Sequence, residues 1–382
     1  MQISYTYKIF EAVDELPYDW EILAKQNILF SFAYLKSLQQ SKPKNVTCFF
    51  IGLYQNGVLM AIAMAQLINL NALESFGERD KCIKTFFRNL VFRNFCSNVL
   101  VLGNNFFTGQ NAFVFDINAD KTALLSTLKN AAIQLKTQLK NQGNPVHITS
   151  IKDFTSDEIK YFDKQVFADF TSFVVQPNMI FSIDKKWKNE QDYIADLSKK
   201  YRDQYKRSHK KAEQITKTKL DLEAIKSLQK IINKLYFYVA KNAPFNTFFL
   251  AENHFENLKE NLHDNFLFYG YFINNELVGF NTLIKNGSKM ETYFLGYDEQ
   301  VQRDKMLYLN MLYDMIGYSI KKQFSQIIFA RTALEIKSSV GAKPLEMTAF
   351  MRHENKFINK FMPFFIRYFE PKVAWQQRNP FK

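Results

Sequence analysis

A strongly basic segment, residues 196–215, is the first feature of the sequence that could carry chemistry. Seven basic residues form or flank one stripe of this segment when it is drawn as a helix: Lys199, Lys200, Arg202, Lys206, Arg207, Lys210 and Lys211. Only Asp203 lies among them, so the like charges repel one another, and a bound phosphate would relieve that repulsion. We interpret the helix as a phosphate-binding surface in which Arg202 and Arg207 make two-pronged contacts. The alternative is an exposed, solvated helix face.

A second polar group follows the apolar run QIIFA, at residues 331–337. Ligands bind at the ends of strands in α/β sheets, so Arg331, Glu335 and Lys337 are candidate site residues. Glu335 could accept a proton from an attacking amine, and Arg331 or Lys337 could bind a phosphate or hold a carbonyl oxygen as charge develops on it. The alternative is a structural ion pair of Glu335 with Arg331 or Lys337.

The elements that must position these residues alternate between helices and strands. In the first half we expect helices near 20–26, 31–39 and 119–141, a hairpin turning at 55–57, a loop and basic helix at 76–95, and strands near 98–103, 145–153 and 167–184. In the second half we expect a basic helical stretch at 185–218, helices at 221–241, 253–261 and 302–322, a three-stranded meander turning at 274–275 and 286–288, and a strand at 326–330. The order is broadly repeated and predicts a mixed α/β protein with two domains, 1–183 and 184–382.

Composition limits the class of protein. The chain has 382 residues, 47% hydrophobic and 23% charged, which excludes a disordered or fibrous protein. A net charge of +13 indicates an anionic partner. No secretory signal and no membrane-spanning run is found, so we expect a cytoplasmic protein. The cysteines, Cys48, Cys82 and Cys96, show no metal-binding spacing, and we expect reduced thiols and no metal.

The order of elements, together with GYFINNELVGFNTL, LGYD before a helix and a last strand leading into RTALEIKSSVGAKP, resembles the acyl-CoA N-acyltransferase (GNAT) fold. The double copy, KKYRDQYKRSHKK and VLVLGNNFFTG are similar to the FemAB-like branch, which pairs two GNAT domains and includes peptidoglycan bridge-forming transferases. The resemblance covers nearly the whole chain. It implies transfer of an acyl or aminoacyl group to an amine.

The resemblance also implies site residues. A simple GNAT domain cradles the pyrophosphate of its cofactor with a glycine-rich turn, but this chain has Gln302-Arg303-Asp304-Lys305 there, so Arg303 could supply charge instead. The alternative is a solvated helix start. Tyr297 and Tyr308 fall where such a site places its thioester or ester, and one of them could act as general acid to the leaving group. The alternative for both is a core tyrosine.

Together these features predict an N-acyltransferase that uses acyl-CoA or acyl carrier protein as donor and a small molecule, lipid or cell-envelope precursor as acceptor. A second hypothesis is aminoacyl-tRNA-dependent transfer to a peptidoglycan precursor. A third, from another class, is a non-catalytic protein that binds RNA or an anionic membrane. The C-terminal segment, where aromatic and basic residues alternate after residue 356, adds the option of peripheral contact at the inner face of the membrane.

Overall fold

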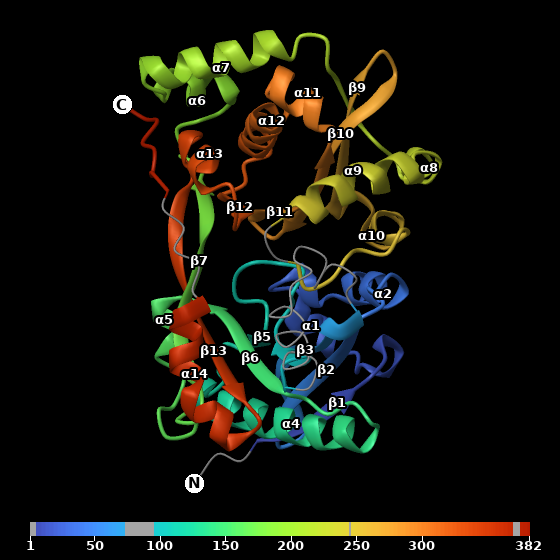
Figure 1. Cartoon of the computed structure of the whole chain (residues 1–382), viewed down its shortest axis with the longest axis vertical. Coiled ribbons are helices and arrows are strands. Elements are labelled where there is room, and N and C mark those ends of the chain that lie inside the picture. The colour runs from blue at the N-terminus through green and yellow to red at the C-terminus, as the bar shows by residue number, and fades with distance from the viewer. Residues whose placement is uncertain (1–4, 73–94, 244–245, 370–374) are drawn as a thin grey trace, which may run out of the picture. The chain divides into compact units, whose positions relative to one another are not determined.

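The computed structural model describes residues 5–72, 95–243, 246–369 and 375–382, which form two compact units. The first unit comprises Met1–Val175, Thr247–Ala251 and Glu346–Lys372, and the second comprises Gln176–Asn246, Glu252–Leu345 and Val373–Lys382. A single cut at residue 183 differs from this division in three segments, 176–183, 247–251 and 346–372. Two of them arise because strands β7 (Thr171–Ser182) and β13 (Lys343–His353), labelled in Figure 1, each have residues in both units. The basic helix expected at 76–95 lies outside the described residues except for Phe95, and Cys82 lies outside them as well.

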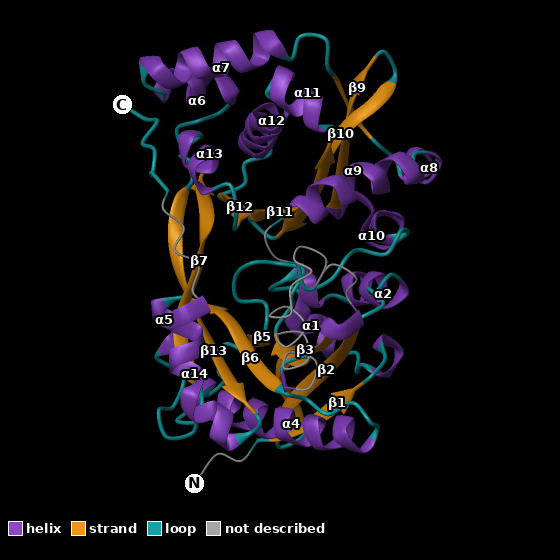
Figure 2. Ribbon diagram, in the orientation of Figure 1, coloured by secondary structure: helices purple, strands orange, loops and turns teal. Residues whose placement is uncertain are grey.

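The first unit is built on a mixed sheet with strand order β1-β2-β3-β4-β6-β13, and β5 pairs with β3. Its strands are β1 (Thr6–Phe10), β2 (Val46–Gln55), β3 (Val58–Asn69), β4 (Asn98–Leu102), β5 (Phe113–Phe115) and β6 (Ile148–Phe154). Its helices are α1 (Trp20–Ala24), α2 (Phe32–Gln40), α4 (Lys121–Asn141), α5 (Ser156–Ile159) and α14 (Lys356–Phe369), with 3-10 turns at Val13–Glu15, Ile28–Phe30 and Leu70–Ala72 (Figure 2). The β4–β6 pair is parallel, and the β6–β13 pair is antiparallel.

Local sequence signals explain several of these elements. Asn56 and Gly57 both have positive φ, 49° and 82°, which closes the predicted β2–β3 hairpin with a tight turn. Asp120 caps α4 by accepting hydrogen bonds from the backbone N–H groups of Thr122 and Ala123. One face of α4 buries Leu124, Leu128 and Leu135 in the core of the unit, as an amphipathic helix on a sheet must.

The second unit has the strand order β7-β12-β11-β10-β9-β8. Its remaining strands are β8 (Thr216–Lys219), β9 (Phe266–Ile273), β10 (Glu276–Asn286), β11 (Lys289–Tyr297) and β12 (Gln326–Ala330). Its helices are α6 (Glu190–Asp196), α7 (Lys199–Lys211), α8 (Leu222–Ser227), α9 (Gln229–Asn242), α10 (His254–Leu262), α11 (Glu299–Lys305), α12 (Leu307–Lys321) and α13 (Leu334–Ser339), with a 3-10 turn at His263–Asn265. The predicted meander β9-β10-β11 and the predicted strand QIIFA are confirmed.

Three predicted helices of the second unit differ from the structure. The stretch expected at 185–218 divides at Leu197, where the backbone is extended, and it ends before β8, which pairs with β9. The helix expected at 221–241 divides at Leu228 into α8 and α9. The helix expected at 302–322 divides at Met306, whose φ of 52° is left-handed and cannot continue an α-helix.

Candidate functional site

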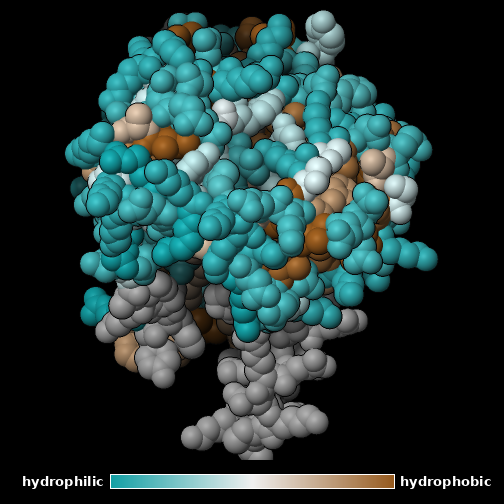
Figure 3. Space-filling model, turned by 90° about the horizontal axis from the view of Figure 1, so that it is seen from above, coloured by the Kyte–Doolittle hydropathy of each residue, from teal (hydrophilic) through white to brown (hydrophobic). Residues whose placement is uncertain are grey.

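The predicted basic helix exists as α7 and lies on the second unit with an open, charged face. Tyr201 and Ser208 are buried, and Asn310 of α12 donates a hydrogen bond to the Ser208 carbonyl at 3.1 Å. The opposite side exposes six cationic side chains, those of Lys199, Lys200, Lys206, Arg207, Lys210 and Lys211. Viewed from the α7 side, the surface is mostly hydrophilic (Figure 3). Within the described ranges, no carboxylate forms an ion pair with Lys206, Arg207 or Lys210, so this face is available to an anion.

Arg202 and Arg207, which the sequence analysis assigned the same phosphate-binding role, have different environments in the structure. The Arg202 side chain is half-buried, and its guanidinium donates to the carbonyl of Leu197, where α6 ends. Arg202 therefore stabilises the bend between α6 and α7. Arg207 is exposed. Of the pair, Arg207 is the better placed to contact a ligand.

An open pocket of about 400 Å³ lies beside α7. It is lined by residues of α7, of α13 and of the C-terminal segment: Lys200, Tyr201, Gln204, Glu335, Ile336, Ser339 and Arg378. Gln204 connects α7 with α12 and α13 at this pocket. Its amide donates to the Tyr313 hydroxyl at 3.3 Å and to the Ser339 hydroxyl at 3.2 Å. The fold thus brings the predicted basic helix and the predicted base Glu335 to the same pocket.

Glu335 has a cationic partner in this pocket, Arg378. The Nε of Arg378 lies 3.0 Å from Oε1 of Glu335, and the Arg378 backbone N–H donates to the hydroxyl of Ser338 at 3.0 Å. Arg378 is 43 residues distant in the chain from Glu335, and no local pattern marks it. The sequence analysis considered Arg331 and Lys337 as partners of Glu335 and did not find Arg378.

Lys337 is turned away from the pocket into the protein. Its ammonium donates to the carbonyls of Phe329 (2.6 Å), Ala330 (3.4 Å) and Arg331 (2.6 Å), and its side chain is buried. Burial lowers the pKa of Lys337 to about 7. The three carbonyls lie where β12 ends in a strained turn, since Ala330 and Thr332 have φ values of 60° and 68°. In this position Lys337 holds the strand end from inside.

The other two predicted cationic site residues, Arg331 and Arg303, differ in their contacts and exposure. Arg331 follows β12 directly, and its Nε donates to the carbonyl of Gln176 in β7 at 3.1 Å. Arg303 lies exposed on α11, where it forms an ion pair with Glu299 one turn earlier. An exposed pair of this kind contributes little to stability, so Arg303 remains available to other anions.

Strands β11 and β12 of the second unit pair with each other over only part of their length. β11 and β12 pair in parallel over only three positions, from Lys289–Gln326 to Glu291–Ile328, although β11 continues to Tyr297. Tyr297 lies at the end of this unpaired part, with its ring centroid 6.4 Å from that of Tyr308 on α12. Burial raises the pKa of both hydroxyls, so both stay protonated at neutral pH. No contact joins either ring to Glu335 in the described residues.

A polar network that the sequence analysis missed connects α6, α7 and α12. The hydroxyl of Tyr205 donates to Glu190 at 3.2 Å, and its ring lies 3.9 Å from the imidazole of His209 and 4.9 Å from Tyr313, centroid to centroid. Burial raises the pKa of Glu190, which the hydrogen bond from Tyr205 only partly offsets. The signal in the sequence is the i, i+4 spacing of Tyr205 and His209 in the basic helix.

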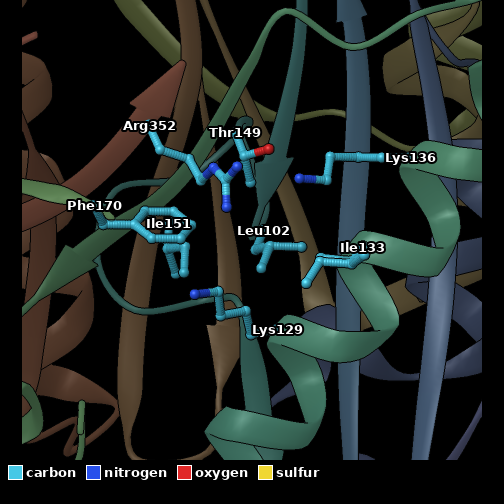
Figure 4. Close-up of a pocket in the computed structure, with 9 residues that line it drawn as sticks. Leu102, Lys129, Ile133, Lys136, Thr149, Ile151, Phe170 and Arg352 are labelled. Carbon is cyan, nitrogen blue, oxygen red and sulfur yellow. The ribbon is translucent and has the colours of Figure 1, made fainter. Parts of the chain in front are cut away.

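The first unit has a small cavity of its own, lined by residues of α4, β6 and β13 (Figure 4). The cationic ends of Lys129, Lys136 and Arg352 point into the same space there. Lys129 pairs with Asp169 at 2.7 Å, and Lys136 pairs with Glu354 at 2.8 Å. Burial alone would raise the pKa of Asp169, but the Lys129 hydrogen bond and the charges of Arg352 and Lys129 lower it. The Lys136–Glu354 pair and the ion pair of Arg352 with Asp169 attach the end of β13 to the unit. The cavity, at about 10 Å³, has room for no more than a water.

Neither a metal-ligand cluster nor a membrane-spanning helix occurs in the described ranges. No three His, Cys, Asp or Glu side chains come together there as metal ligands would. No helix in these ranges is long and apolar enough to cross a bilayer. Cys48 and Cys96 are free thiols.

Comparison with solved structures finds the same arrangement elsewhere. FemX matches with a TM-score of 0.57 and 12% sequence identity, over 93% of this chain and 99% of FemX. A tandem GNAT protein from the clavulanic acid biosynthesis pathway also matches, with a TM-score of 0.52 and 8% identity, over 92% of this chain and 98% of that protein. This chain has the tandem GNAT fold. No family model matches the sequence, and no curated protein matches it.

The tandem GNAT fold confirms the predicted fold class and the resemblance to FemAB-like proteins at the level of architecture. At identities of 8% and 12%, the comparison shows a likeness of fold. The separated strands β11 and β12 belong to the second of the two copies, and β4 and β6 form the parallel pair of the first.

Proposed function

We propose that this chain transfers an acyl group from an activated, phosphate-bearing donor to the amine of an acceptor. The observation that carries the proposal is the tandem GNAT fold, matched over nearly the whole chain, together with the parallel strands β11 and β12, which separate after three residue pairs. Where such strands separate, the backbone groups that would otherwise pair with the neighbouring strand become available to an extended substrate. Holding the acyl carbonyl beside the amine is the main catalytic device in this proposal.

The donor's phosphates would lie on the exposed face of α7. Lys206, Arg207 and Lys210 supply positive charge there without a carboxylate partner among the described residues, and Lys200 extends the charge to the rim of the pocket. Arg303 on α11 is an additional, weaker candidate contact. Arg202, Arg331 and Lys337 donate hydrogen bonds to backbone carbonyls, so their proposed role is to position the elements that carry the site.

In this proposal a carboxylate accepts a proton from the amine, and a tyrosine hydroxyl donates one to the leaving group. An attacking amine must lose a proton, and the Glu335 carboxylate, half-exposed on the pocket, could accept it through water. The leaving thiol or hydroxyl needs a proton, and Tyr297 or Tyr308 could donate one because burial raises the pKa of each and so keeps the hydroxyl protonated at neutral pH. As the bond from nitrogen to the acyl carbon forms and the bond to the leaving sulfur or oxygen breaks, the neutral amine loses one proton to Glu335 and the leaving group gains one from the tyrosine. Proton exchange with water then returns Glu335 and the tyrosine to their starting states.

Acyl-CoA or an acyl carrier protein is the preferred donor, and aminoacyl-tRNA is the second candidate. The charge of α7 supports aminoacyl-tRNA as a candidate donor, because the six exposed cations of the helix present more charge than one pyrophosphate requires. The acceptor would then be a cell-wall precursor, as the resemblance to the bridge-forming transferases implies.

The test is a donor assay on the purified full chain. Protein is incubated with a pooled amine fraction from cells and either an acyl-CoA panel, acylated carrier protein or charged total tRNA, and amide products are identified by mass spectrometry. Product from acyl-CoA that survives RNase supports the first candidate, and product from charged tRNA that RNase abolishes supports the second. Binding of donors without any amide product, at every donor and pH tried, would overturn the proposal in favour of a non-catalytic binder.

A further inference from the structure

Helix α14 of the first unit carries a row of exposed aromatic side chains. Phe357, Phe361, Phe364 and Phe365 are 74%, 45%, 66% and 41% exposed. Their spacing, i, i+4, i+7 and i+8, places them along one face of a helix. Four exposed phenylalanines on one helix of a folded unit are too many to be scattered surface residues, because contiguous apolar surface in water is rare unless it binds something.

The helix is fixed to its unit, so the row is not the result of a frayed terminus. Met362 is buried, and Ile358 and Ile366 are half-buried on the inner face. Asn355 caps the first turn by accepting hydrogen bonds from the N–H groups of Phe357 (2.9 Å) and Ile358 (3.2 Å). Asn359 donates to the carbonyl of Asp169 at 2.9 Å. The inner face therefore sets the direction of the aromatic face.

The charges on α14 are all of one sign. Lys356, Lys360 and Arg367 are exposed, and the helix contains no acidic residue. At 100° per residue these three positions fall on one arc, which borders the aromatic row on the side away from the buried face. A helix with a phenylalanine face and a basic edge has the features of one that lies in a membrane interface.

We propose that α14 docks the protein on an anionic lipid surface, with the phenylalanines among the acyl chains and the basic edge at the head groups. A bilayer accepts a convex ridge of aromatic rings without a matching groove, and anionic head groups match the three cations. A second copy of this chain fits less well, because the same three cations would face each other. The inference is independent of the proposed transfer activity and uses none of its residues.

The experiment is vesicle binding by the full chain. Sedimentation is measured with vesicles of phosphatidylcholine alone and with vesicles in which about a third of the lipid is phosphatidylglycerol. We expect wild type to sediment with the anionic vesicles only, and less as salt is raised. Substituting Phe357→Ser, Phe361→Ser and Phe364→Ser together should weaken binding about tenfold or more, and so should Lys356→Gln, Lys360→Gln and Arg367→Gln together.

Matched controls change equally exposed residues elsewhere on the same unit. Tyr18→Ser, Val58→Ser and Ile117→Ser remove three exposed apolar side chains, and Lys25→Gln, Lys140→Gln and Lys164→Gln remove three charges. Both controls should bind like wild type. If the three lysine substitutions of the charge control weaken vesicle binding equally, the binding depends on net charge alone and the proposal is overturned. Failure of wild type to bind anionic vesicles would also overturn it.

A second readout keeps the test valid if a triple variant folds poorly. Phe364→Trp preserves an aromatic ring, and its fluorescence should shift to the blue when anionic vesicles are added, whereas Ile117→Trp should not shift. If the vesicles sediment the protein but the fluorescence of Phe364→Trp does not shift, the membrane contact lies on another surface, such as α7, and the proposal is overturned. Self-association in solution that the phenylalanine substitutions abolish, without vesicle binding, would make α14 a dimer contact and overturn the proposal.

Discussion

The guanidinium of Arg378 donates to the carboxylate of Glu335 on the wall of the α7 pocket, with Nε and Oε1 3.0 Å apart. Their side chains are 29% and 49% exposed, so solvent screens the pair. The pair holds the C-terminal segment against α13 and orients the carboxylate at the same time. These two effects can be separated, because either residue can be changed alone.

Glu335→Gln should lower the maximal rate of transfer about 10²-fold with substrate binding retained, because the amide cannot accept the proton of the amine. Steady-state kinetics and thermal melting on the same sample measure both quantities. Arg378→Gln is the matched control, since it removes the pair and leaves the carboxylate, and it should keep most of the rate at a stability cost below about 1 kcal/mol. Equal loss of rate in both variants would assign Glu335 a structural role.

Lys206→Gln, Arg207→Gln and Lys210→Gln together should raise the KM for a phosphate-bearing donor and flatten its dependence on salt, because three phosphate contacts are lost. The melting temperature should hardly change, since all three side chains are exposed. Arg202 is excluded from the set because its guanidinium donates to Leu197.

The matched control for this surface is Lys230→Gln, Lys234→Gln and Lys322→Gln, which removes the same charge from exposed positions of the same unit. An equal rise in KM there would mean that net charge, and not α7, attracts the donor. An unchanged KM in the α7 variant would refute the assignment directly.

Lys337→Met should destabilise the second unit by about 2 kcal/mol or more, because the carbonyls of Phe329, Ala330 and Arg331 lose their donor. Lys343→Met, at an exposed position six residues on, is the control and should have little effect. Chemical denaturation measures the difference. A variant as stable as wild type would show that the three hydrogen bonds do not hold the strand end.

The stability of wild type should also depend on pH through Lys337. Burial lowers the pKa of this ammonium to about 7 in the folded chain, whereas an unfolded lysine titrates near about 10.4. Between these values the unfolded state binds more protons, so the free energy of unfolding should rise with pH. Lys337→Met should lack that rise when the two unfolding curves are compared from pH 7 to pH 9.

Glu291 supplies the opposite pH dependence. This glutamate of β11 is buried, its Oε1 accepts a hydrogen bond from Asn286 at 3.3 Å, and burial raises its pKa to about 7. Between the unfolded value of about 4.3 and 7 the folded state binds more protons, so stability should fall as pH rises through this window. Glu291→Gln should remove the fall and melt at a higher temperature than wild type at pH 8. A lower melting temperature at pH 8 would contradict the assignment.

Local patterns were sufficient to predict most of the elements. The turns at Asn56-Gly57 and Asn274-Asn275 adopt positive φ as their residue types predict, and the strand QIIFA has the predicted bounds. The basic helix was predicted from its charges and spacing alone. The errors fell where one residue, Leu197, Leu228 or Met306, leaves helical geometry within a run that otherwise favours a helix.

Local sequence patterns were enough to predict the alternation of helices and strands and the cationic face of α7, because each depends on residues near one another in the chain; the order of these elements predicted the tandem organisation. The pairing of Glu335 with Arg378, the inward turn of Lys337 and the pairing of β13 with β6 are known only from the folded chain. Such pairs form between segments that local propensity treats independently. Their energies depend on burial and register, which exist only once the sheets have formed.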